Sequence, residues 1–94
     1  MNIVKQSESF VLTDTTDVFD CYCEFNCNVD GNINIHINVR DLNEINIGNV
    51  DYNLYNQSKQ VHLSVNCEKN KQYEITSYAN TVIDTVIEYI NKDK

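Results

Sequence analysis

The sequence predicts an α+β fold, in which an antiparallel sheet of five to six strands in meander order packs against one C-terminal helix as a two-layer sandwich. Two observations lead to this expectation. Apolar and polar residues alternate along most of residues 9–76, which is typical of half-buried strands. After Ser77 the apolar residues recur with the period of an amphipathic helix. The length of 94 residues and the hydrophobic content of 41% fit a single domain spanning residues 1–94.

The first strand is expected at residues 9–13, with Phe10 and Leu12 facing inward, and a turn at residues 14–17 follows it. The next strand, residues 18–29, has the longest alternation in the chain. Its inward set is Phe19, Cys21, Cys23, Phe25, Cys27 and Val29. Facing residues of neighbouring strands share one side of a sheet, so Leu12 is expected to pair with Phe19 and Phe10 with Cys21.

Residues 32–40 form the third expected strand, and the hairpin that joins it to residues 18–29 has a predictable register. A two-residue loop would pair Cys27 with Asn34 and so oppose apolar and polar residues. A three-residue loop over residues 29–31 pairs Cys27 with Ile33 and places Gly31 in the left-handed position of a bulged turn. On the polar side Asp20 then meets Arg40, and Glu24 meets His36.

Three more strands are expected, at residues 50–55, 61–67 and 72–76, with a bulge near Gly48 where the alternation slips. Residues 41–44 resemble a capping box and predict either one helical turn or a loop. The helix is expected at residues 77–92 with Ser77 as its N-cap. Its apolar stripe, which should cover the cysteine-lined side of the sheet, is Ala79, Val82, Ile83, Val86, Ile87 and Ile90.

The negative charge is concentrated in the first part of the chain. The net charge is −7, and residues 6–58 contain Arg40 as their one cationic side chain against nine acids. Lysine shares the A/T-rich codon bias of the abundant asparagine, isoleucine and tyrosine, so its scarcity here is unexpected. The sequence therefore predicts an acidic surface, with the polar side of the sheet either wet or in contact with a partner. Such a surface disfavours direct binding to nucleic acid and favours a basic protein partner.

The cysteines Cys21, Cys23, Cys27 and Cys67 do not predict a metal site. Three of them lie on one expected strand, where a rise of about 3.3 Å per residue puts Cys21 and Cys27 roughly 20 Å apart. Zinc requires all of its sulfur ligands within about 2.3 Å of one point. We expect buried thiols, with a disulfide from Cys67 to a neighbouring strand as the alternative.

No catalytic motif or cofactor site is evident. His36 and His62 fall on the polar side of their strands, opposite to the strand cysteines, so a Cys–His pair is not expected. Residues 14–20 lack the glycine and the final glutamate of a calcium-binding EF-hand loop. We therefore expect no enzyme activity, no metal and no cofactor. The chain has no long apolar run and no apolar segment near Met1, so no membrane association and a cytoplasmic location are expected.

These features predict a non-catalytic inhibitor or nucleic-acid mimic that covers a basic surface of a nucleic-acid-binding protein or nuclease. The expected partner-binding residues are Asp14, Asp17, Asp20, Tyr22, Glu24, Asp30, Asp41, Glu44 and Asp51. Phage proteins of the anti-CRISPR and DNA-mimic type are similar in size and charge, although no motif is shared. The alternatives are an immunity protein or antitoxin that neutralises a cognate toxin, and a self-assembling structural module, with a homodimer as its simplest form.

Overall fold

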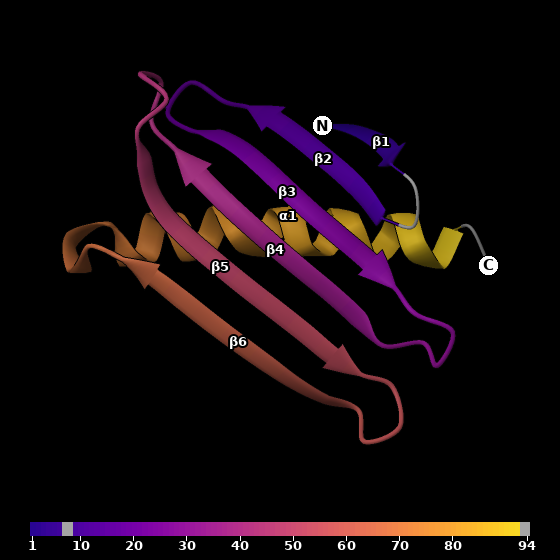
Figure 1. Ribbon diagram of the computed structural model, residues 1–94. Helices are drawn as coiled ribbons and strands as arrows, with labels where there is room; N and C mark the ends of the chain where they lie inside the picture. Colours follow the sequence, from indigo (N-terminus) through magenta and orange to yellow (C-terminus); the bar gives the residue numbers. More distant parts are fainter. Residues whose placement is uncertain (7–8, 93–94) are drawn as a thin grey trace.

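Six antiparallel strands and one long helix make up the computed structural model, which describes residues 1–6 and 9–92 (Figure 1). Each strand pairs with the next strand in the chain, which gives a meander of order β1-β2-β3-β4-β5-β6. The strands are β1 (Asn2–Gln6), β2 (Ser9–Thr15), β3 (Asp20–Cys27), β4 (Ile33–Arg40), β5 (Asn46–Tyr55) and β6 (Gln60–Cys67). A short 3-10 turn, η1 (Lys69–Lys71), leads into the helix α1 (Gln72–Lys92). The predicted fold class is confirmed.

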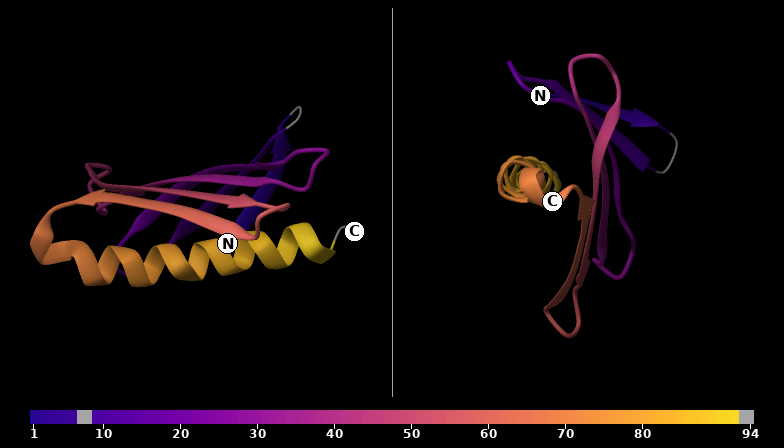
Figure 2. Two further views of the ribbon diagram at one scale, coloured as in Figure 1. Left: turned by 90° about the horizontal axis from the view of Figure 1, so that it is seen from below. Right: turned by 90° about the vertical axis from the view of Figure 1, so that its left-hand side faces the viewer.

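The helix lies against one side of the sheet and crosses the strands obliquely (Figures 1 and 2). It buries Ile75, Ala79, Val82, Ile83, Val86 and Ile90. The sheet contributes Leu12, Phe19, Cys21, Cys23, Phe25, Ile33, Ile35, Ile37, Val39 and Val50. The predicted covering of the cysteine-lined side is therefore confirmed, although Ile87 is only partly buried. We call the side of the sheet away from α1 the outer face.

The β3–β4 hairpin has the predicted register. Cys27 pairs with Ile33, Asp20 pairs with Arg40 and Glu24 pairs with His36. Gly31 has a φ of 85°, the left-handed conformation that this turn requires. The parity of the apolar residues, together with one glycine, was sufficient to fix this pairing.

The predicted pairing of the two N-terminal strands is wrong by four residues. Leu12 pairs with Cys23 and Phe10 with Phe25, not with Phe19 and Cys21. β2 continues to Thr15, and the turn lies at residues 16–19 instead of 14–17. A slip by an even number of residues keeps every side chain on its predicted face, so parity could not exclude it. In the observed register the ring of Phe10 stacks on the ring of Phe25, and the two ring centroids are 5.2 Å apart.

The predicted strand at residues 72–76 is also wrong, because these residues form the first turns of α1. Ile75 lies four residues before Ala79 and so extends the buried helical stripe by one turn. Ser77 is therefore inside the helix and is not its N-cap. The sixth strand is β1, which the sequence analysis missed, because its five residues Asn2–Gln6 show no clear alternation.

The bulge expected near Gly48 is present. Val39 pairs with Gly48 whereas Arg40 pairs with Asn46, so Ile47 is the additional residue on β5. A Cβ atom at Gly48 would lie 3.0 Å from Cδ1 of Ile75. The glycine therefore allows the first turn of α1 to approach β5 closely. Residues 41–45 form a loop and not a helical turn.

The apolar side chains of β6 are more exposed than the regular alternation of apolar and polar residues in this strand predicts. Val65, Leu63 and Val61 pair with Val50, Tyr52 and Leu54 and so lie on the helix side of the sheet. Their exposed fractions are nevertheless 36%, 46% and 50%. Figure 2 shows why, because the β5–β6 hairpin extends beyond the region that α1 covers.

Candidate functional site

Two neighbouring turns form one end of the sheet, and they extend from the ion pair between Asp20 and Arg40. The guanidinium Nη2 of Arg40 lies 2.7 Å from Oδ2 of Asp20, and both side chains are partly buried. Residues 16–19 lead into Asp20, and residues 41–45 follow Arg40. The two segments therefore lie side by side (Figure 1). We call residues 16–19 and 41–45 together the acidic loop end.

Hydrogen bonds from side chains to the backbone give both segments a defined shape. In the first, the Thr16 hydroxyl oxygen accepts from the backbone N–H of Val18 at 3.2 Å and of Phe19 at 2.9 Å. In the second, the Asp41 carboxylate accepts from the N–H of Asn43 at 2.8 Å and of Ile45 at 3.0 Å. Such local bonds stabilise turns, and they hold the remaining side chains outward.

Exposed apolar side chains accompany the acids of the acidic loop end. The acids are Asp17, Asp41 and Glu44, and neither segment contains a lysine, arginine or histidine. The apolar residues are Val18, Leu42 and Ile45, with exposed fractions of 58%, 55% and 60%. Apolar residues are normally buried when the core has room for them. Their exposure beside charges of one sign is typical of surfaces that bind another protein.

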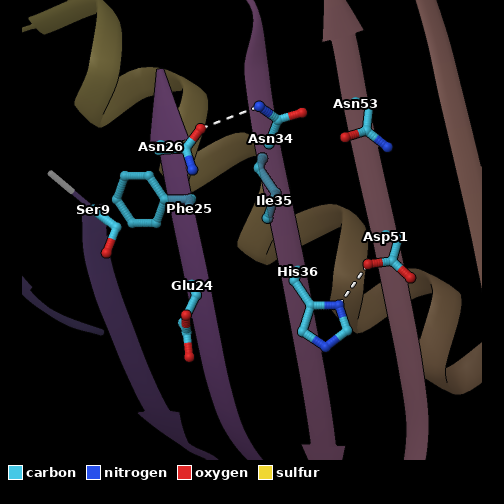
Figure 3. A pocket seen from close by; sticks show the side chains of 9 residues that line it. All are labelled: Ser9, Glu24, Phe25, Asn26, Asn34, Ile35, His36, Asp51 and Asn53. Atoms are coloured by element: carbon cyan, nitrogen blue, oxygen red, sulfur yellow. Dashed lines mark hydrogen bonds and ion pairs between the residues drawn. The ribbon is translucent and has the colours of Figure 1, made fainter. Parts of the chain in front are cut away.

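The outer face carries a second, more dispersed group of predicted residues. The side chains of Tyr22, Glu24 and Asp51 lie on this face, as do those of Asp20 and Arg40. Nδ1 of His36 lies 2.5 Å from Oδ1 of Asp51, so this acid has a partner within the face (Figure 3). Glu24 is exposed. The negative charge of the outer face is therefore partly offset by Arg40 and, when it is protonated, by His36.

A small depression on the outer face lies between β2 and β5. It has a volume of about 210 Å³, and its rim includes Glu24, His36 and Asp51 (Figure 3). The amide of Asn34 donates a hydrogen bond of 3.1 Å to the side-chain oxygen of Asn26 across its upper part. Pockets for small ligands usually have volumes of about 300–1,000 Å³ and are largely apolar. The depression is therefore smaller and more polar than a typical ligand site.

Two of the predicted residues lie apart from both groups. Asp14 lies on the helix side of β2 and accepts a 2.7 Å hydrogen bond from the hydroxyl of Tyr78 in α1. Asp30 lies in the β3–β4 turn, at the opposite end of the strands from the acidic loop end. The structure thus brings Asp17, Asp41 and Glu44 together beside Asp20, but it does not gather all nine residues on one surface.

The apolar residues Val18, Leu42 and Ile45 are not among the residues that the sequence predicts for the site. A usable signal was present, since each interrupts a polar segment in which no apolar residue is needed for the core. Residues 41–44 resemble a capping box, and the alternation over residues 18–29 places Val18 in a strand. Both interpretations gave these side chains a structural role and concealed their exposure.

The four cysteines are free thiols, and Cys21 and Cys23 are buried. Burial raises the pKa of Cys21 from 9.0 to about 11 and the pKa of Cys23 from 9.0 to about 12. Both buried thiols are therefore protonated at neutral pH, which makes them poor nucleophiles and poor metal ligands. Within residues 1–6 and 9–92, no group of three or more His, Cys, Asp and Glu side chains could hold a metal ion.

The only long helix is amphipathic, and among the described residues no helix is long and apolar enough to cross a membrane. Comparison with known proteins adds no assignment. The chain matches no protein-family model, no curated protein and no solved structure.

Proposed function

We propose that this chain is a non-catalytic binding protein whose acidic loop end docks on a basic surface of a target protein. The observation that carries the proposal is the combination, in residues 16–19 and 41–45, of three acids with three exposed apolar side chains and no cation. Charges of one sign accelerate the encounter with a surface of opposite sign, and apolar side chains provide contact area once the two surfaces meet.

We further propose that the target is a protein that handles nucleic acid, so that the chain acts as an inhibitor in the cytoplasm. A surface that normally binds phosphates is rich in lysine and arginine. The carboxylates of Asp17, Asp41 and Glu44 would occupy the positions of phosphate groups on that surface. The net charge of −7 prevents the chain from competing for the nucleic acid itself.

The outer face is a second contact region in this proposal. Tyr22 and Glu24 lie on β3, the strand that begins at Asp20, and so continue the surface away from the acidic loop end. A tyrosine among polar residues provides rigid amphipathic area, which is favoured in interfaces. Asp14 and Asp30 are not part of the contact, because one is held by Tyr78 and the other lies at the opposite end.

A pull-down from host lysate, followed by mass spectrometry, tests the proposal. The immobilised wild-type chain should retain a basic nucleic-acid-binding protein at low salt and release it at high salt. The double variant Asp17→Lys with Glu44→Lys should lose this protein. The control Asp30→Lys with Asp84→Lys changes the charge equally at exposed sites elsewhere and should keep it.

Two further results decide between the proposal and its alternatives. Nucleic acid added to the purified complex should displace the chain, because both occupy the same basic surface. Retention of the target by the Asp17→Lys with Glu44→Lys variant would contradict a role for the acidic loop end. A toxin as the retained protein, with no displacement by nucleic acid, would identify an immunity protein instead.

A further inference from the structure

The outer edge of β6 lacks the features that usually protect an edge strand. Exposed edges are normally blocked by a charged side chain, a proline, a bulge or a very short strand. β6 has eight residues, Gln60–Cys67, and contains no lysine, arginine, acid or proline. It pairs with β5 over its whole length without a register shift, so no bulge turns its edge away. In the described part of the chain, β5 is its one strand neighbour.

The same strand also has a row of exposed apolar side chains. Val61, Leu63 and Val65 lie on the helix side of the sheet and remain 50%, 46% and 36% exposed, since the β5–β6 hairpin extends beyond α1 (Figure 2). At one end, Val65 and Cys67 border a pocket of about 510 Å³ next to the first turns of α1. The unpaired backbone edge of β6 thus lies beside exposed apolar side chains. One partner strand could form hydrogen bonds with this edge and cover these side chains.

We propose that β6 pairs with β6 of a second copy of this chain, antiparallel and around a twofold axis, to form a homodimer with a continuous twelve-stranded sheet. In this arrangement the same strand is used by both copies, as an isologous interface requires. The proposal is independent of the proposed function, because the acidic loop end takes no part in it.

Charge favours a second copy as the occupant. β6 contains no lysine, arginine or acid, whereas the other edge strand, β1, contains Lys5, so two β6 strands can pair without bringing like charges of the strands together. A basic target would be attracted elsewhere, to the acidic loop end. Lys59 and Glu68, which flank β6, provide opposite charges at the two ends of the strand.

The register follows from side-chain parity and from these flanking charges. Val61, Leu63 and Val65 remain on one face if Leu63 pairs with Leu63 of the second copy and Val61 with Val65. Lys59 is then opposite Cys67 of the other copy and not opposite a charged residue. Of the two neighbouring registers of the same parity, the one centred on His62 would shorten the pairing to residues 60–64, and the one centred on Ser64 would place Lys59 opposite Lys69. Like charges directly opposite each other are destabilising, so the register centred on Leu63 is favoured.

Sedimentation equilibrium at several protein concentrations tests the dimer. The interface is small, so we expect dissociation in the micromolar range. Increasing NaCl from about 0.05 M to about 0.5 M should strengthen the dimer, because salt screens the repulsion between two acidic copies. Binding to a basic target would respond to salt in the opposite direction, so the two proposals can fail separately. A monomer at all concentrations up to about 1 mM would overturn the dimer.

Leu63→Lys places two lysines face to face at the twofold axis and should weaken the dimer at least tenfold. Ser64→Lys introduces the same charge on the outer face of the same strand and should have a much smaller effect. Leu63 is half exposed in the monomer, so Leu63→Lys should keep its circular dichroism spectrum. An unchanged dimer in the Leu63→Lys variant would overturn the proposed interface.

Cysteine cross-linking tests the register without disturbing the strand. In a background of Cys27→Ser and Cys67→Ser, Leu63→Cys should form an intermolecular disulfide on oxidation. Directly opposite residues have Cα atoms about 4.5–5.5 Å apart, which is within the range for a disulfide. Ser64→Cys, one residue further along, faces His62 of the second copy and should not cross-link to itself. The reverse pattern would overturn the register centred on Leu63.

Discussion

The hydroxyl of Tyr78 donates a hydrogen bond to the carboxylate of Asp14, with 2.7 Å between the two oxygen atoms. This contact joins the second turn of α1 to β2, 64 residues earlier in the chain. The side chain of Asp14 is only 15% exposed, and its Oδ1 also lies 3.7 Å from the N-terminal amino group of Met1. We therefore expect Tyr78→Phe to lower the free energy of unfolding by about 1.5–3 kcal/mol, the range for hydrogen bonds to charged groups.

Chemical denaturation of both single variants and of the double variant with Asp14→Asn measures this coupling. Tyr73→Phe is the control, because Tyr73 lies in the same helix and is 84% exposed. It should change the free energy of unfolding by less than about 0.5 kcal/mol. Additive effects of Tyr78→Phe and Asp14→Asn would contradict a direct contact between the two side chains.

Stability should fall steeply in alkali. The pKa of Cys21 is raised to about 11 and that of Cys23 to about 12, chiefly by burial. The pKa of Tyr78 is raised from 10.0, first by burial and then by its hydrogen bond to Asp14. In the unfolded chain these groups lose their protons nearer their ordinary values, which begin at 9.0 for the thiols. The stabilisation is therefore complete below about pH 9 and is lost as the pH rises through about 12.

Urea unfolding at several pH values under reducing conditions measures this loss. The variant Cys21→Ala with Cys23→Ala should show a shallower decline between pH 9 and pH 11. The variant Cys27→Ala with Cys67→Ala removes the two less buried thiols and should keep the steep decline. Equal declines in the two variants would show that general charge repulsion, not the buried thiols, causes the alkaline instability.

Gly48→Ala should destabilise the protein where α1 begins. The new methyl group would lie 3.0 Å from Cδ1 of Ile75 and 3.3 Å from Cβ of Cys67. Overpacking of this kind costs about 1–3 kcal/mol. Ile75→Val removes Cδ1 and costs about 0.5–1.5 kcal/mol by itself. The cost of Gly48→Ala should be smaller in the Ile75→Val background, and thermal unfolding of the four proteins measures the difference. An equal cost in both backgrounds would contradict the contact.

Ser77→Ala tests the position of the helix start. If Ser77 were the N-cap, its replacement would cost about 1 kcal/mol. Since α1 begins at Gln72, Ser77 lies inside the helix and is exposed. Alanine has the higher helix propensity, so we expect unchanged or slightly increased stability by about 0.5 kcal/mol. A decrease in the melting temperature of several degrees would contradict the observed start.

Sequence patterns predict a part of the fold correctly where only one arrangement of the chain is compatible with the pattern. The β3–β4 register follows from parity together with Gly31, because a two-residue loop opposes apolar and polar residues and the loop over residues 29–31 gives the glycine its left-handed position. The β2–β3 register does not, since a slip of four residues preserves parity, and the observed pairing is the one in which Phe10 stacks on Phe25. Likewise, the spacing of Tyr73 and Ile75 is compatible with a short strand and with a helical turn. The helical turn is observed, and in it Ile75 packs against Gly48.

The candidate site was less predictable than the fold. Composition predicts that the surface is negative, but it does not predict where the acids lie. In the structure they lie on the loops as well as on the outer face. Asp14 shares the parity of Phe10 and Leu12, and it faces α1 because β2 continues to Thr15, beyond the expected turn at residues 14–17. The exposure of Val18, Leu42 and Ile45 depends in the same way on turns whose ends shift with the strand register.

The meander topology has a consequence for how the chain reaches its fold during synthesis. Every strand pairs with a neighbour in sequence, and α1 follows all six strands. Pairing between sequence neighbours costs little loop entropy, so hairpins such as β3–β4 can form early and quickly. Their apolar side, with Cys21, Cys23 and Phe25, remains uncovered until α1 leaves the ribosome. The nascent sheet therefore passes through a stage in which chaperones, or other nascent copies, compete with α1 for the same surface.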